Sequence, residues 1–222
     1  MTIFRQLTKL AAAFGVALAL AGCGVNSIPT KDQAMKAAWA NVQAAYQRRA
    51  DLIPNLANTV AGYAAQEKSV LTAVTQARAS ATQVKVDAST ITDPAKFAEF
   101  QQAQDKLSGV LGRLMAISEN YPDLKSNANF LALQSQLEGT ENRIEIARRD
   151  YNTTVQDYNT ELVTIPGSLW ASTLYKSYKP ATPFAASAAA QSAPVVHFQG
   201  DTSTAPQPSA AAAQPGTQPA KP

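Results

Sequence analysis

The stretch that decides the fold is Phe130–Leu162, FLALQSQLEGTENRIEIARRDYNTTVQDYNTEL. Apolar side chains recur along it at steps of three and four residues, which is the spacing of one face of an α-helix. The stretch therefore predicts a long amphipathic helix that begins near Asn127 and ends before Pro166. Its apolar stripe comprises Phe130, Leu133, Leu137, Thr140, Ile144, Ala147, Tyr151, Val155, Tyr158 and Leu162.

Two further stretches show the same periodicity. One begins at Asp93-Pro94, a cap followed by a proline at the first helical position, and ends at Pro122. The other begins earlier in the chain, and only two of its stripe positions are charged, Arg49 and Glu67. The stripe of the stretch that begins at Asp93 comprises Phe97, Phe100, Gln104, Leu107, Leu111, Leu114, Ser118 and Tyr121. The stripe of the earlier stretch comprises Trp39, Val42, Tyr46, Arg49, Ile53, Leu56, Val60, Tyr63, Glu67, Val70, Val74, Ala77 and Ala81.

Pro54 lies inside the earlier stretch. An interior proline removes a backbone hydrogen bond and clashes with the preceding turn, at a cost of about 3 kcal/mol. Asp51 is suited to cap a new helix there, so we expect a kink or break at 51–54. Thr30-Lys31-Asp32-Gln33 fits a capping box at the start of the stretch.

A break there gives four helices, and the sequence predicts an all-α, up-and-down antiparallel four-helix bundle with long helices. The longest connection, about 83–92, is expected at the tip of the bundle. Four parts follow along the chain: a signal peptide (1–22), a lipidated tether (23–31), the helical bundle (32–179) and a disordered tail (180–222). The tail is predicted because eight of the thirteen prolines lie in it, with a single Asp and a single Lys.

The N-terminus is typical of an exported protein. Arg5 and Lys9 precede the apolar run 10–20, and small residues follow. Leu20-Ala21-Gly22-Cys23 resembles a bacterial lipobox, and Cys23 is the single cysteine of the chain. We expect Cys23 to carry lipid that holds the protein on a membrane outside the cytoplasm. Because Gly24 follows in place of Asp, the outer membrane is favoured in a Gram-negative organism.

The charge balance argues against a nucleic-acid partner. The net charge of +3 includes two positive charges of the signal, so the remaining chain carries about +1. Nucleic-acid binding needs clustered basic residues on one face.

The sequence also carries no pattern of a catalytic, cofactor or metal site. The single histidine, His197, lies in the tail, and Cys23 is committed to lipid. A nucleophile with its base, a zinc site and a di-iron site therefore all lack their residues. We expect no enzymatic activity and no cofactor.

Charged residues remain as candidates for structural contacts. Glu138, Glu141 and Glu145 share one helix face ahead of Arg148 and Arg149, which is typical of a solvated face. Arg49 and Glu67 lie in an apolar stripe, and an unpaired buried charge is costly. Each is expected to find a partner on a facing helix or to reach solvent.

Two segments are candidates for contact with other molecules. Trp170, Tyr175 and Tyr178 lie among leucines and lysines, which suits either the closed end of a bundle or a membrane interface. The run 194–198, PVVHF, is suited to adding a strand to a partner's sheet.

Several motifs resemble the LemA family. They are Gln47–Leu56 (QRRADLIPNL), Gly62–Glu67 (GYAAQE), Ala77-Arg78-Ala79, Tyr121–Lys125 (YPDLK), Asn129–Gln134 (NFLALQ), Leu137–Ile144 (LEGTENRI), Ala147–Asn152 (ARRDYN) and Tyr158-Asn159. The resemblance covers about 32–166. It implies a four-helix antiparallel bundle exposed outside the cytoplasmic membrane on an N-terminal anchor, with no established enzymatic activity. The lipobox and the Ala/Pro tail depart from the family pattern.

The motifs also point to one contact. If antiparallel packing brings Arg48–Leu56 against Glu138–Asp150, then Arg48 or Arg49 pairs with Glu141 or Glu145 and pins the bundle. For function, the sequence favours a lipid-anchored envelope scaffold or adaptor that binds another envelope protein. The alternative is a membrane-remodelling or lipid-binding protein whose amphipathic helices enter the bilayer. The oligomeric state stays open.

Overall fold

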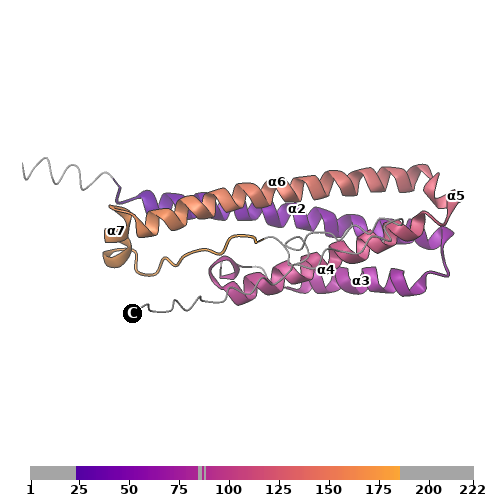
Figure 1. The fold of residues 1–222 in the computed structure, drawn as a ribbon, viewed down its shortest axis with the longest axis horizontal. Coiled ribbons are helices and arrows are strands. Elements are labelled where there is room, and N and C mark those ends of the chain that lie inside the picture. The colour runs from indigo at the N-terminus through magenta and orange to yellow at the C-terminus, as the bar shows by residue number, and fades with distance from the viewer. Residues whose placement is uncertain (1–23, 85–86, 88, 186–222) are drawn as a thin grey trace, which may run out of the picture. The chain divides into compact units, whose positions relative to one another are not determined.

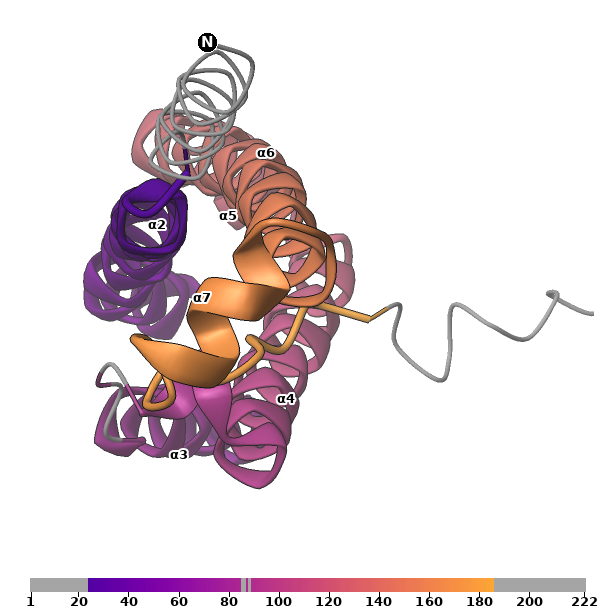
Figure 2. The same cartoon turned by 90° about the vertical axis from the view of Figure 1, so that its left-hand side faces the viewer.

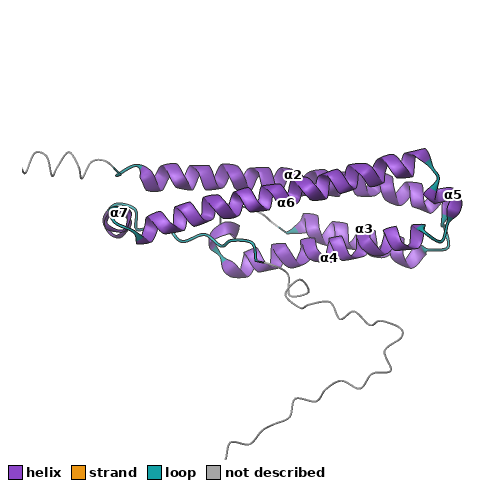
Figure 3. Cartoon of the chain, turned by 45° about the horizontal axis from the view of Figure 1, so that its top comes forward, coloured by secondary structure: helices purple, strands orange, loops and turns teal. Residues whose placement is uncertain are grey.

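The computed structural model describes residues 24–84, 87 and 89–185, and all regular elements within these ranges are helices (Figure 3). The long helices are α2 (Ser27–Tyr63), α3 (Lys68–Gln83), α4 (Pro94–Ser118) and α6 (Ala128–Val163). Short helices lie between or after them: η1 (Thr90–Thr92), α5 (Pro122–Lys125) and α7 (Gly167–Thr173).

Successive long helices run in opposite directions, with α2 packed along α6 and α3 packed along α4 (Figure 1). Figure 2 looks along the helices and shows them surrounding a common interior. The predicted all-α fold with long antiparallel helices is confirmed. Among the described residues, no helix combines the length and the apolar character needed to cross a membrane.

The break expected at 51–54 is wrong, because α2 continues through Pro54 to Tyr63, and the chain breaks at 64–67 instead. Pro54 has no N–H for the carbonyl of Ala50, four residues earlier. That carbonyl accepts a hydrogen bond of 2.8 Å from Arg78 Nε on α3. A side chain from a neighbouring helix thus replaces the missing backbone donor, while Asp51 remains an exposed helix residue that accepts from Gln47 at 2.8 Å.

The helix starts were predicted with mixed success. Asp93 caps α4 by accepting from the N–H groups of Ala95 and Lys96, as expected. The helix α6 begins at Ala128, beside the predicted start near Asn127, and the side chain of Asn127 caps it in the same way. The capping box at 30–33 is wrong, because α2 begins one turn earlier, at Ser27.

The interior divides into two apolar clusters that lie towards opposite ends of α2 and α6. The cluster towards α5 is mainly aliphatic and includes Ile53, Leu56, Leu107, Leu111, Leu114, Phe130 and Leu137. The cluster towards α7 is rich in aromatic rings and includes Trp39, Tyr46, Phe97, Phe100, Tyr151, Tyr158 and Phe184. The stripe residues predicted for α4 and α6 are almost all buried, so the periodicity identified the core correctly.

The boundary at residue 180 is wrong, because 180–185 are packed against the bundle, with Ala181 and Phe184 buried. The segment runs between α6 and α4 in an irregular, non-helical conformation (Figure 1). α2 and α6 extend past the start of α4, so the α3–α4 connection does not form the tip of the bundle (Figures 1 and 3). α7 and the segment that follows it occupy that end. The predicted signal peptide, Cys23, and the run 194–198 lie outside the described residues.

Candidate functional site

Arg49 connects three helices in the middle of the bundle. Its side chain is 1 % exposed. Nη1 donates to Ser108 Oγ of α4 at 2.7 Å and to Glu141 Oε1 of α6 at 2.9 Å. Nη2 donates to Gln104 Oε1 of α4 at 2.6 Å. The structure thus contains one of the ion pairs considered from the motifs, between Arg49 and Glu141.

The surroundings of Arg49 favour a structural role. Its guanidinium lies 5.0 Å from the centre of the Tyr46 ring, in a cation–π contact. Burial raises the pKa of the Tyr46 phenol, and the positive charges of Arg148 and Arg49 oppose that shift. The Glu141 side chain is 43 % exposed, so water screens its ion pair with Arg49. The buried side-chain amide of Gln104 therefore contributes much of the stabilisation of the Arg49 guanidinium.

The other candidate residues lie apart from this contact. Glu67 lies in the turn between α2 and α3 and not in a helix stripe, and it accepts a hydrogen bond of 2.9 Å from the Tyr121 hydroxyl. That hydrogen bond raises the pKa of Tyr121. Arg48 and Glu145 are exposed on α2 and α6.

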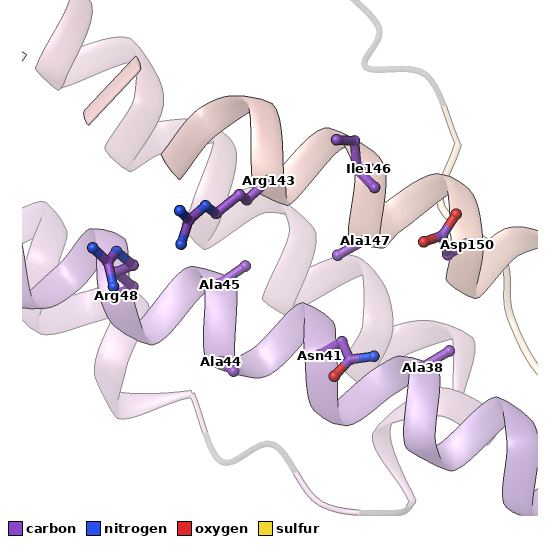
Figure 4. A pocket seen from close by; sticks show the side chains of 9 residues that line it. All are labelled: Ala38, Asn41, Ala44, Ala45, Arg48, Arg143, Ile146, Ala147 and Asp150. Carbon is purple, nitrogen blue, oxygen red and sulfur yellow. The ribbon is translucent and has the colours of Figure 1, made fainter. Parts of the chain in front are cut away.

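A groove lies between α2 and α6 on the outer surface, with a volume of about 480 Å³. Arg48 of α2 and Arg143 of α6 project towards one part of it, and Asp150 lies further along α6 (Figure 4). Alanines make up much of the remaining lining, and their small side chains let the two helices approach closely. The groove therefore offers a small-residue floor with two cations at one end. The other lining residues are Ala38, Asn41, Ala44, Ala45, Ile146 and Ala147.

A second site holds the segment after α7. Asn159 and Asn152 each bind the backbone of one residue with both atoms of the side-chain amide. Asn159 accepts from Ala181 N and donates to Ala181 O, both at 2.8 Å. Asn152 accepts from Phe184 N at 2.8 Å and donates to Phe184 O at 3.0 Å.

The residue before each asparagine is a tyrosine that adds a further backbone contact. Tyr151 donates to the carbonyl of Thr182, and Tyr158 donates to the carbonyl of Lys179, both at 3.0 Å. Burial raises the pKa of Tyr158 to about 12 and that of Tyr151 further. Both phenols therefore remain donors throughout the physiological pH range.

The ring of Phe184 fills an aromatic pocket. It lies 4.8 Å from the Phe97 ring, 5.6 Å from Tyr151 and 6.0 Å from Trp39, between ring centres. The guanidinium of Arg148 lies 4.5 Å from the centre of the Phe184 ring, opposite the core. This pocket was missed from the sequence. The one signal was the Tyr-Asn pair repeated seven residues apart at Tyr151 and Tyr158.

At the same end of the bundle, several aliphatic side chains face solvent. Trp170, Tyr175 and Tyr178 pack partly against the aromatic cluster, which matches the bundle-closing interpretation of these aromatics. The exposed aliphatic residues are Val163, Ile165, Leu169 and Leu174, with exposures of 74 %, 89 %, 56 % and 63 %.

These features define a class of protein: an all-helical antiparallel bundle with a polar contact at its centre and a C-terminal segment docked along one helix. The chain belongs to the LemA family, whose family model matches residues 38–198. This range includes the docked segment.

Two kinds of curated protein are similar to parts of the chain. Protein LemA of Metamycoplasma hominis is 26 % identical over 123 residues, which cover 55 % of this chain and 52 % of that protein. Magnetosome protein MamQ 2 of Paramagnetospirillum magneticum is 36 % identical over 64 residues, 29 % of this chain and 24 % of that protein. MamQ 1 of the same organism gives the same values. The chain thus spans about half of the LemA relative and about a quarter of the magnetosome proteins.

Proposed function

We propose that the chain is a non-enzymatic, lipid-anchored scaffold or adaptor of the bacterial envelope, which binds another envelope protein through its bundle. The groove between α2 and α6 is the observation that supports this proposal most directly. Arg48 and Arg143 lie beside a floor of alanines, on which a helix could pack closely. The partner that fits this chemistry is a helical segment with small residues and carboxylates.

The anchor and the location are parts of the same proposal. Lipid on Cys23 would hold the protein on a membrane outside the cytoplasm, on the outer membrane in a Gram-negative cell. α2 begins at Ser27, four residues after that cysteine, so the attached end of α2 would lie close to the bilayer. The groove, which begins about one-third of the way along α2, would then face the periplasm.

Site-specific photo-cross-linking in living cells tests this function. A photoreactive residue at Asn41 or Ile146, inside the groove, is expected to give a discrete adduct with one envelope protein. The matched control is the same residue at exposed Lys106 of α4. Arg48→Glu together with Arg143→Glu should abolish the adduct while the amount of lipidated protein stays unchanged. Adducts that form equally from Lys106, or that persist after charge reversal, would refute the groove as the binding site.

The exposed aliphatic residues at the α7 end support a second candidate function, membrane remodelling or lipid binding. Val163, Ile165, Leu169 and Leu174 would meet the bilayer surface if the lipid on Cys23 held that end against it. Flotation of the form lacking 1–23 with liposomes separates the two functions. A scaffold stays in the aqueous fraction, whereas a lipid-binding protein floats and ceases to float after Ile165→Ser and Leu174→Ser.

A further inference from the structure

The docked segment is held in the way that a protein holds a peptide ligand. Hydrogen bonds from α6 go to backbone atoms of Lys179, Ala181, Thr182 and Phe184. Two more connect the segment to the opposite wall: Thr182 N donates to the Ile91 carbonyl at 2.8 Å, and Gln101 of α4 donates to the Ala185 carbonyl at 2.9 Å. Backbone contacts of this kind are available to any extended chain.

Two periodicities match in this site. Tyr151-Asn152 and Tyr158-Asn159 are seven residues apart on a helix, a rise of about 10.5 Å. Their backbone partners, Ala181 and Phe184, are three residues apart, which is about 10 Å in an extended chain. Two Tyr-Asn pairs that lie two turns apart on α6 therefore bind backbone positions that lie three residues apart on the segment.

The resident segment also indicates which side chains the site accepts. Ala181 and Phe184 are buried, at 5 % and 7 % exposure, so a small residue and an aromatic residue are required three apart. Pro180 and Pro183 are exposed, and the contacts described above use no backbone N–H at either position. Proline restricts the free chain to an extended conformation and so lowers the entropy lost on binding.

From these contacts we infer that the Tyr-Asn face of α6 is a peptide-binding site. Its ligand class is an extended proline-containing segment of a separate protein, with the pattern Pro-small-x-Pro-aromatic, and 179–185 are its intramolecular occupant. The ligand exchanges with that occupant. The site lies on the face of α6 towards α4 and η1, away from the Arg48–Arg143 groove, so it does not depend on the function proposed above.

The occupant leaves part of the site unfilled. A cavity of about 440 Å³ lies beside Lys179, lined in part by Asp32, Lys36 and Tyr158. Lys179 lines this cavity without filling it, so a ligand with a different side chain at that position would gain contacts there. This difference gives a partner segment the means to compete with an occupant that is covalently attached.

Fluorescence anisotropy with a labelled peptide of the sequence 179–185, KPATPFA, tests the inference on the full chain. Phe184→Ala removes the ring that holds the occupant and so opens the site. We expect the peptide to bind the Phe184→Ala chain saturably below 1 mM, and at least tenfold more weakly to the unchanged chain, whose site is occupied. Thermal melting by circular dichroism checks that each chain retains its bundle.

Two controls separate the specific site from a hydrophobic surface. A peptide methylated on the nitrogen that corresponds to Ala181 N keeps all side chains but cannot donate to Asn159, and it should bind at least tenfold more weakly. Asn152→Leu with Asn159→Leu in the Phe184→Ala chain should have a similar effect, whereas Asn142→Leu, at an exposed position on α6, should have none.

Three outcomes would overturn the inference. The first is the absence of saturable binding up to 1 mM by a Phe184→Ala chain whose helical melting is intact. The second is equal binding of the methylated and unmethylated peptides. The third is a dimer of the unchanged chain that the peptide dissociates, which would assign the site to a second copy and not to a separate partner.

Discussion

In the half of the bundle near α5, the interior is closed by helices alone, with α3 and α4 covering α2 and α6 (Figure 1). In the half near α7, α2 and α6 extend past the start of α4, and a non-helical segment covers the aromatic cluster. The first arrangement joins elements that cannot separate without unfolding. The second depends on a short segment held by one aromatic ring and a row of backbone hydrogen bonds.

Because of this difference, α6 packs against different kinds of partner in the two halves. α6 presents a continuous stripe to the core, but the partners of this stripe change along the helix. Near Leu137 they are aliphatic side chains of the neighbouring helices, and at Tyr151 and Tyr158 they include an extended segment. Arg49 lies between the two clusters and is bound to both α4 and α6. We therefore expect the two halves to respond differently when each is perturbed.

Removing the central contact should have the largest effect. Arg49→Ala leaves a cavity and leaves the buried Oε1 of Gln104 without its donor, so the free energy of unfolding should fall by about 3 kcal/mol. Urea denaturation followed by circular dichroism measures it. Arg48→Ala, at the exposed neighbouring position, is the matched control and should change stability by less than about 0.5 kcal/mol. Equal effects of the two substitutions would contradict the structural role of Arg49.

Phe184→Ala should lower stability by about 2 kcal/mol at most, because the segment can detach while the helices remain packed. The expected signature is local: the amides at positions 181, 182 and 184 lose protection from hydrogen exchange, and those of α4 near Leu114 do not. Leu174→Ala, at a residue 63 % exposed, is the control and should leave protection unchanged. A uniform loss of protection across both halves would refute the distinction.

Arg78→Ala should cost about 1 to 2 kcal/mol, because the buried carbonyl of Ala50 loses its donor. In a Pro54→Ala background, residue 54 regains an N–H for that carbonyl, so the same substitution should cost about 1 kcal/mol less. A double-mutant cycle of denaturation free energies measures the coupling. Strictly additive effects would show that Arg78 does not compensate for the proline.

The smallest effect concerns acid stability at the α7 end. Lys31 and Ser27 hold the pKa of Glu161 below its ordinary value of 4.5, with hydrogen bonds of 2.6 Å each. A lowered pKa gives a stabilisation that is present above pH 4.5 and lost as the pH falls through the folded-state pKa. Glu161→Gln should therefore remove less than about 1 kcal/mol at pH 7, and less still at pH 3. Melting temperatures across this range measure the difference, and an equal loss at both pH values would contradict it.

How far the sequence predicts this molecule depends on whether the signal is local. The stripes of α4 and α6 were predicted correctly, since a period of three and four residues is set by each helix itself. The cap at Asp93 and the start of α6 near Asn127 were predicted for the same reason. The Arg49–Glu141 contact was one of several pairings considered, and only the packing of α2 against α6 selects among them.

The errors share a non-local cause. Pro54 does not end α2, because Arg78 donates a hydrogen bond to the carbonyl of Ala50. This donor lies 28 residues from Ala50 along the chain, beyond the reach of a local sequence pattern. Residues 180–185 have the composition of a disordered tail, but their partners Asn152 and Asn159 lie in another element. The local helix and loop propensities of these residues indicate neither of these long-range contacts. The seven-residue Tyr-Asn repeat was visible in the sequence, but nothing there indicated that its ligand was the chain itself.

Native-state hydrogen exchange of the unchanged chain tests most directly whether the two halves are closed by different means. The amide of Phe184, bound to Asn152, and the amides of α6 near Leu137 are compared across increasing denaturant. The account predicts that Phe184 exchanges through a local opening that hardly depends on denaturant, at a lower free energy than Leu137. Exchange of both amides with the same free energy and the same denaturant dependence would contradict it.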